Sequence, residues 1–564
     1  MQGYKLPAML TDIAISQSAP IRHIKDIAAS IQVSNNDLEY YGKHKAKLPL
    51  SLIDHEKIAR HHLVLVTAIT PTPAGEGKTT ISVGLTDGLN MIGKKAMAVL
   101  REPSLGPVFG LKGGATGGGY SQIIPMEDIN LHFTGDFAAI EKANNLLAAL
   151  IDHNLQNKKR SLQLDPRTIV WKRVMDMNDR ALRHIVIGLG GTANGITRED
   201  GFNITPASEI MAILCMCTGM DDLKRRLGNI YIGTTFAGVP VFARDLNAVG
   251  AMAILLKDAI KPNLVQTLEG NPAILHGGPF ASIAQGTNSI LATQMGLSLS
   301  EYVITEAGFA ADLGAEKFFD IKCVEAGLKP KAVVVVATIR ALRHHGGCKK
   351  DELGMASPER VQKGLPNLGK HLENMQLFGM KAVVAINAFP GDAEEEIELV
   401  KAFCKTYGAE AVLCTGFTDG GKGMTELAHA VTRLVENNGS HFHPLYEREM
   451  AIEEKIHTIA TKVYGAGAVE YSVKARTQLK HIKELGFEQL PVCMAKTPKS
   501  LSDDERKPGR PEGFIVTVRE FEFAAGAGFV IPILGEMMRM PGLPVVPAAE
   551  SIDIDAAGVI TGLS

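Results

Sequence analysis

The sequence lacks the features of a secreted, zinc-binding or membrane-spanning protein. Its seven cysteines include no C-x-x-C pair, and the closest two, Cys215 and Cys217, lie inside an apolar segment. An odd number of scattered cysteines indicates buried reduced thiols. No apolar run reaches the roughly 20 residues that cross a membrane, and no basic stretch precedes an apolar one at the N-terminus. We therefore expect a cytoplasmic protein.

An excess of charge of one sign is also missing. Lys plus Arg number 59 and Asp plus Glu 61, a net charge of −2. This balance argues against a protein that binds nucleic acid through bulk charge. The chain has a single tryptophan, Trp171, and its 564 residues are too many for one ordinary core, so we expect several domains.

Apolar runs of strand length alternate with helical patterns over most of the chain. The runs at 63–69, 185–190, 331–337 and 381–388 show no polar alternation. Strands buried on both faces have this pattern, which predicts mainly parallel sheets covered by helices and an α/β fold.

One of these strands leads into "TPTPAGEGKTT" at 70–80. Gly77, Lys78 and Thr79 fit the phosphate-loop pattern G-x-x-x-x-G-K-[ST], but Thr72 stands where glycine is usual. A helix predicted from Lys78 completes the order strand, loop, helix. Loop and helix N–H groups in this arrangement point at an anion. The alternative is a tight turn without a ligand.

If the loop binds a nucleotide, its residues can be assigned contacts with the phosphates and with Mg²⁺. Lys78 is predicted to reach the outer phosphates of a nucleotide, and the Thr79 hydroxyl to bind Mg²⁺. A carboxylate is expected to complete the Mg²⁺ shell. Position in the sequence suggests two candidates for it, Asp136 and Glu306. The predicted cofactor-binding residues are Thr72, Pro73, Ala74, Gly75, Glu76, Gly77, Lys78 and Thr79.

Two stretches rich in polar residues, at 351–376 and 435–449, interrupt the α/β pattern. We predict a P-loop NTPase-like nucleotide-binding and catalytic domain at 1–362, with a mainly parallel sheet. Two smaller α/β domains with mixed sheets are predicted at 363–445 and 446–564.

Arg101 and Glu102 follow the next predicted strand, where sites gather in open parallel sheets. Arg101 could neutralise charge beside the γ-phosphate, or it could form an ion pair with Glu102 or another acid. For His344 and His345 we expect a solvated helix end. For His276 we expect a structural hydrogen bond. Phe389 and Pro390 line a cleft or form a structural turn.

Longer stretches resemble one family. "GLKGGATGGGYSQIIPMEDINLHFTGD", "TLEGNPAILHGGPFASIAQGTNSI", "EAGFAADLGAEKFFDIKC" and "MPGLPVVPAAESIDID", together with the loop, are similar to blocks of the formate–tetrahydrofolate ligases, from about residue 10 to the C-terminus. The resemblance implies that ATP, formate and tetrahydrofolate give 10-formyltetrahydrofolate, ADP and phosphate through formyl phosphate. It also implies a monofunctional homotetramer supported by K⁺ or NH₄⁺.

The resemblance assigns further roles. Lys78 and Arg101 become catalytic residues, and 363–445 contributes to the folate cleft. The family holds the folate ring between a Phe-Pro pair, here Phe389 and Pro390, and a tryptophan whose position is Phe417. Leu413 and Glu102 complete the predicted folate contacts, and the substrate is possibly polyglutamylated. Apart from the resemblance, composition alone makes the glycine run 113–119 a candidate cover that excludes water.

Two alternatives stay open. The chain could be a nucleotide-dependent switch, although no guanine-recognition motif follows a strand. It could also be a weakened homologue that binds folate, which the change to Phe417 slightly favours.

Overall fold

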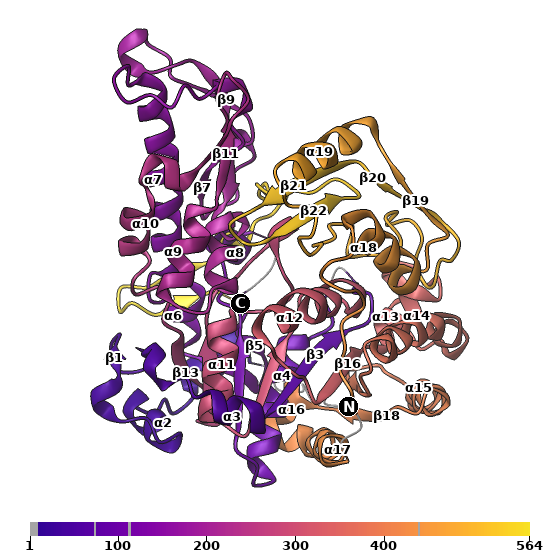
Figure 1. Ribbon diagram of the computed structural model, residues 1–564. Helices are drawn as coiled ribbons and strands as arrows, with labels where there is room; N and C mark the ends of the chain where they lie inside the picture. The colour runs from indigo at the N-terminus through magenta and orange to yellow at the C-terminus, as the bar shows by residue number, and fades with distance from the viewer. Residues whose placement is uncertain (1–9, 73–74, 111–113, 438–439, 564) are drawn as a thin grey trace.

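A large mixed sheet forms the centre of the computed structural model, which describes residues 10–72, 75–110, 114–437 and 440–563 (Figure 1). Its strands lie in the order β1 (Glu39–Tyr40), β2 (Ala46–Lys47), β13 (Asn263–Thr267), β14 (Pro272–Leu275), β4 (Ala96–Leu100), β15 (Tyr302–Glu306), β3 (His62–Ala68), β16 (Ala332–Ala337), β17 (Ala382–Asn387), β18 (Glu410–Cys414). From β14 to β18 every neighbouring pair is parallel. The predicted α/β class and mainly parallel sheet are confirmed.

Helices cover both faces of this sheet, which explains its apolar strands. Leu63 and Leu65 pack toward α11 (Ile290–Leu299) and α14 (Pro358–Leu377), while Val64 and Val66 pack toward α4 (Lys78–Met91) and α17 (Thr425–Glu436). Successive side chains of a strand point to opposite faces, so a strand covered on both sides has no polar alternation.

The segment 363–445 supplies β17 and β18 to the same sheet as β3, and the predicted boundary at 362 falls within α14. The division of the chain into three domains stays a prediction. The later segment contains α18 (Ile452–Thr458), α19 (Val473–Glu484), a parallel pair of β19 (Ala468–Tyr471) and β20 (Ile515–Val518), and an antiparallel pair of β21 (Glu520–Ala524) and β22 (Phe529–Ile533).

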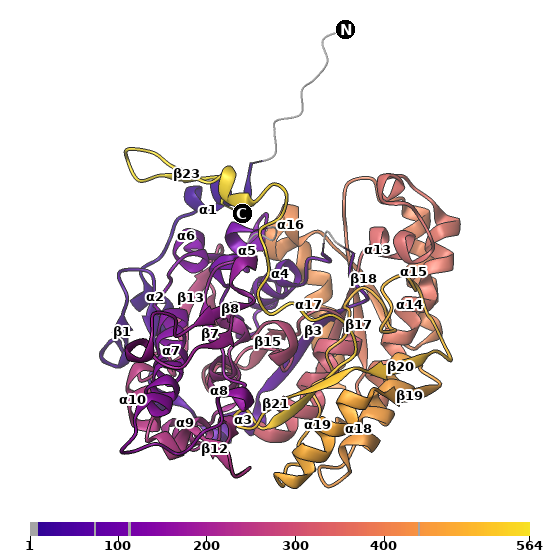
Figure 2. The same ribbon diagram turned by 90° about the horizontal axis from the view of Figure 1, so that it is seen from above.

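A further lobe projects from the sheet in Figure 1. It contains α7 (Asp136–Gln156), β7 (Arg173–Met175), β9 (Arg198–Asp200) and β11 (Tyr231–Thr234). At the other end of the chain, β23 (Asp553–Ile554) pairs with β24 (Ile560–Thr561) beside α1 (Asp12–Ser18) (Figure 2). Gln17 Nε2 donates to the Ile560 carbonyl at 3.0 Å, so the two ends of the described chain meet.

The cysteines are free thiols, and all are buried except the partly buried Cys348, as predicted. Within the described residues, no helix has the length and apolar character needed to cross a membrane.

Candidate active site

The predicted site residues gather at the carboxyl edge of the parallel strands. Arg101 follows β4, Glu306 ends β15, and the phosphate loop follows β3. On the other side of the loop, the residues after β16, β17 and β18 continue the same edge. Because β3 lies between β15 and β16, the loop has a polar neighbour on each side.

The phosphate loop is closed by the carboxylate of Glu76. Thr72 donates to Glu76 Oε1 through its N–H at 2.7 Å and its hydroxyl at 3.0 Å, and the Thr338 hydroxyl donates to Oε2. Burial raises the pKa of Glu76, and the hydrogen bonds from Thr338 and Thr72 oppose this. The Glu76 side chain is therefore engaged inside the loop, and the threonine in place of the usual glycine supplies part of this closure.

The loop ends at a glycine for a steric reason. Gly77 has φ 74°, and a Cβ there would lie 2.4 Å from Asn387 Nδ2. That amide also donates to the Glu76 carbonyl at 3.1 Å. Left-handed backbone with a close neighbour admits only glycine. α4 then begins at Lys78, as predicted. The predicted contacts Pro73 and Ala74 lie outside the described residues.

Two buried histidines hold the start of the loop. The Thr70 N–H donates to His371 Nε2 at 3.0 Å, and His345 Nε2 contacts the Thr70 carbonyl at 2.8 Å. Burial lowers the pKa of each histidine to about 4. The prediction of a solvated helix end was wrong for His345, because α13 (Ile339–His345) packs this side chain beneath the loop.

Thr79, Glu306 and Arg101 form a connected group. The Thr79 hydroxyl donates to Glu306 Oε2 at 2.9 Å, and Arg101 Nη2 lies 3.9 Å from Glu306 Oε1. The Arg101 guanidinium packs against the backbone of Gly308, where a Cβ would lie 3.0 Å from Nη1. Of the two carboxylates considered for Mg²⁺, Glu306 is thus the one beside Thr79.

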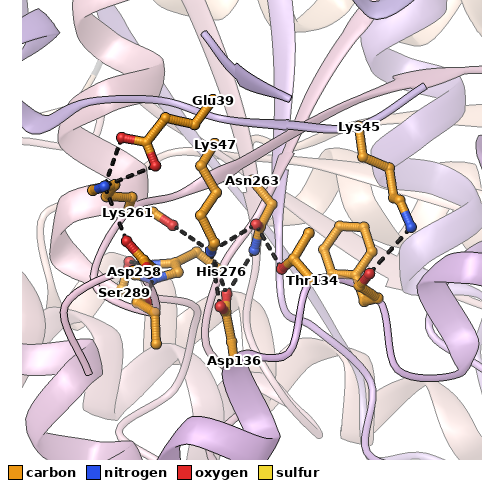
Figure 3. A network of polar contacts seen from close by, with 12 residues as sticks. Glu39, Lys45, Lys47, Thr134, Asp136, Asp258, Lys261, Asn263, His276 and Ser289 are labelled. Atoms are coloured by element: carbon orange, nitrogen blue, oxygen red, sulfur yellow. Dashed lines mark hydrogen bonds and ion pairs between the residues drawn. The ribbon is translucent and has the colours of Figure 1, made fainter. Parts of the chain in front are cut away.

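Asp136 belongs to a separate buried network (Figure 3). Lys47 Nζ lies 2.8 Å from Asp136 Oδ1 and 2.9 Å from Asn263 Oδ1, and both charged side chains are buried. Burial, reinforced by the negative charge of Asp136, raises the pKa of Glu102 well above its usual range. Glu102 is thus a buried acid that faces this network.

His276 borders the same network in Figure 3. Its ring nitrogens contact Ser289 Oγ and the Ala259 carbonyl, both at 2.6 Å, and burial lowers its pKa to about 4. The predicted structural role of His276 is confirmed.

The apolar side chains predicted to bind folate lie beyond the loop, at the carboxyl ends of β17 and β18: Phe389 and Pro390 follow β17, Leu413 lies in β18, and Phe417 follows it. Leu413 and Phe417 are 38% and 36% exposed, which leaves both accessible to a ligand. The Tyr120 N–H donates to the Phe417 carbonyl at 2.9 Å, and a Cβ on Gly119 would lie 2.0 Å from that oxygen. The end of the glycine run thus packs directly against the Phe417 segment.

Sequence reasoning missed Arg340 on α13. Its guanidinium carbon lies 4.4 Å from the centre of the Phe389 ring. A charged residue three positions after a buried strand was the only available signal.

The polar groups of the site suit a magnesium ion. Mg²⁺ prefers hard oxygen ligands and is usually held by one or two protein oxygens together with phosphates and water. Thr79 and Glu306 offer a hydroxyl and a carboxylate within 2.9 Å of each other. No group of three or more His, Cys, Asp or Glu side chains suited to a metal occurs in the described part of the chain.

A comparison with protein families identifies the chain. The model of the formate–tetrahydrofolate ligase family matches residues 10–564. The match covers the phosphate loop, Arg101, the glycine run, Phe389 and Phe417, and it favours the ligase over a nucleotide-dependent switch. The chain belongs to the formate–tetrahydrofolate ligase family, which formylates tetrahydrofolate at the expense of ATP.

Proposed function

We propose that the carboxyl edge of the sheet is the site at which formate is ligated to N10 of tetrahydrofolate through formyl phosphate. The observation that carries this proposal is the contact of Thr79 with Glu306 and of Glu306 with Arg101, directly beside the phosphate loop. Exposed apolar side chains stand on the other side of the same loop. One edge thus offers a charged half for phosphate and formate and an apolar half for folate.

In the charged half, loop N–H groups and Lys78 bind the phosphates of ATP. Thr79 and Glu306 would hold Mg²⁺, which supplies positive charge to the phosphate oxygens when bound. Formate and the γ-phosphate are both anions, and Arg101 lowers their repulsion as they approach. Positioning of this kind can supply roughly 7–11 kcal/mol of the barrier.

The chemistry proceeds in two displacements. A formate oxygen attacks the γ-phosphorus, and the bond to ADP breaks. The N10 amine then attacks the formyl carbon, phosphate leaves with the formate oxygen, and the amine proton is released. Formyl phosphate must be protected from water between these steps. The glycine run is our candidate for this cover.

In the apolar half, the folate ring lies between Phe389 with Pro390 and Phe417, and Leu413 lines the same pocket. A phenylalanine provides a smaller stacking surface than the tryptophan usual in the family. Glu102, a buried acid beside Arg101, is a further proposed contact to the folate. The proposed folate substrate includes its polyglutamylated form.

We also propose a cytoplasmic homotetramer that is supported by a monovalent cation, K⁺ or NH₄⁺. Exposed apolar side chains on the projecting lobe support association: Val170 59%, Val186 57%, Leu189 67%, Phe236 65%, Val239 57%. Apolar groups gathered on one lobe are typical of a protein interface.

The decisive experiment uses ¹⁸O-labelled formate with ATP and tetrahydrofolate. We expect one labelled oxygen in the inorganic phosphate, because the formate oxygen leaves with it. Formylated product with unlabelled phosphate contradicts the formyl phosphate route. Absence of product favours the weakened homologue.

A further inference from the structure

Arg340, at the edge that carries the site, is a cation that forms no ion pair with the described residues. Among the described residues, no carboxylate lies within ion-pair distance of its guanidinium, and no hydrogen bond is made by it; its contact is the ring of Phe389. Asp392 accepts the Phe389 N–H at 2.8 Å through Oδ2. Burial raises the pKa of Asp392, and the charges of Arg343 and Arg340 oppose this without an ion pair to Arg340.

The other arginines of this edge differ. Arg101 lies near Glu306, and Arg343, on the same helix as Arg340, forms a fully buried pair with Glu396. Arg340 is partly buried, so its charge is only partly hydrated. A partly buried guanidinium that forms no ion pair with a carboxylate is suited to bind an anion that arrives with the substrates.

Arg340 and Phe389 each lie two residues after a side chain that hydrogen-bonds to Glu76 of the phosphate loop. Arg340 is two residues after Thr338, which donates to Glu76, and Phe389 is two residues after Asn387, which donates to the Glu76 carbonyl. Two residues span at most about 7 Å. Both side chains therefore start within reach of the phosphates that the loop is proposed to hold.

The contact with Phe389 also leaves the guanidinium usable. A guanidinium over an aromatic ring is oriented by the cation–π attraction, while its N–H donors remain available at its edges. Those donors match the spacing of two phosphate oxygens.

We propose that Arg340 is a second arginine contact to the transferred phosphoryl group, on the folate side of the phosphate loop and opposite Arg101. The proposal rests on the function proposed above. When N10 attacks the formyl carbon, the carbon–oxygen bond to phosphate breaks and the electron pair passes to that oxygen. Arg340 binds the phosphoryl group as this charge grows.

The first test measures binding alone and does not depend on ligase activity. Calorimetry compares a non-hydrolysable ATP analogue with ADP in wild type, Arg340→Met and Arg433→Met. Arg433 is the matched control, because it pairs with Glu410 at the start of β18, on the opposite edge. We expect Arg340→Met to lower the affinity advantage of the analogue over ADP by about tenfold, the value of one charge-assisted contact.

An unchanged advantage in Arg340→Met overturns the proposal. If wild type binds neither nucleotide, the proposed nucleotide site itself fails, which is a different result. Melting temperatures close to wild type confirm that both variants are folded.

The second test separates phosphate from the folate tail. Turnover is compared with monoglutamyl and polyglutamyl tetrahydrofolate. We expect kcat/KM of Arg340→Met to fall by roughly 10- to 100-fold with both substrates, and Arg340→Lys to recover part of it. A fall confined to the polyglutamyl substrate means that Arg340 binds the tail, and it overturns the assignment to the phosphoryl group.

Discussion

The two halves of the site are built differently. Around the phosphate loop, buried polar groups are joined by hydrogen bonds, such as Glu76 with Thr72 and Thr338, and Thr79 with Glu306. Around the proposed folate pocket, Leu413 and Phe417 are exposed apolar side chains without such constraints. Phosphoryl transfer needs dipoles and charges fixed in advance, whereas stacking needs only a ring of suitable position. We therefore expect the proposed folate pocket to tolerate a phenylalanine in place of tryptophan. Around the phosphate loop, we expect the replacement of a polar side chain by a smaller one to be poorly tolerated.

Removing a charge from the nucleotide half should produce the largest effect. We expect Lys78→Ala to lower kcat by about 10²–10³-fold, the usual loss for one group that stabilises developing charge. Tetrahydrofolate binding, measured by calorimetry, should stay unchanged because the folate half is untouched. A variant with nearly normal kcat contradicts the assignment of Lys78.

Removing the buried hydrogen bonds that close the phosphate loop at Glu76 should lower stability as well as activity. Glu76→Ala leaves the buried Thr72 N–H and Thr338 hydroxyl without their acceptor, at about 1–3 kcal/mol for each unsatisfied group. We expect a lower melting temperature and a higher KM for ATP. Glu56→Ala is the control, since Glu56 is an exposed acid paired with Arg60 on the surface. Equal melting temperatures for the two variants show that the closure contributes nothing.

A buried acid on α4 makes stability depend on pH. Burial, reinforced by Glu269, raises the pKa of Asp87 from 3.8 to about 8, and Thr267 and Asn271 donate to it. The folded protein thus keeps a proton that the unfolded chain releases. Stability falls as pH rises from about 4 to 8, by up to about 1.4 kcal/mol per pH unit.

The variant Asp87→Asn removes this titration while keeping an acceptor oxygen. We expect the melting temperature of the variant, relative to wild type, to rise between pH 5 and 8, when both are measured in the same buffers. The comparison cancels the other buried acids, such as Asp176 and Glu209. A constant difference across this range rules out the raised pKa.

Changing the exposed ring should have the smallest effect. We expect Phe417→Ala to weaken the binding of tetrahydrofolate by about 0.5–1.5 kcal/mol, the usual value of an aromatic pair, with little change in kcat. Phe417→Trp should bind at least as well as wild type. Steady-state KM values test both, and an unchanged KM in Phe417→Ala removes this residue from the pocket.

Much of the fold could be predicted from the chain alone. Buried parallel strands were visible as apolar runs without alternation, and the loop was visible because its spacing and its place between strand and helix are local. Lys78 at the helix start and the structural role of His276 were predicted in the same way. The Phe-Pro pair and Phe417 came from family resemblance, since nothing local distinguishes them.

The sequence by itself determined the strand, loop and helix of the proposed phosphate site, because these depend on neighbours a few residues apart. Tertiary structure decided which side chains surround that site. Glu76 bonds Thr338 across 262 positions, His345 reaches Thr70 across 275, and Glu306 rather than Asp136 lies beside Thr79. The physical reason is the strand order β15–β3–β16, which brings together residues that are remote along the chain.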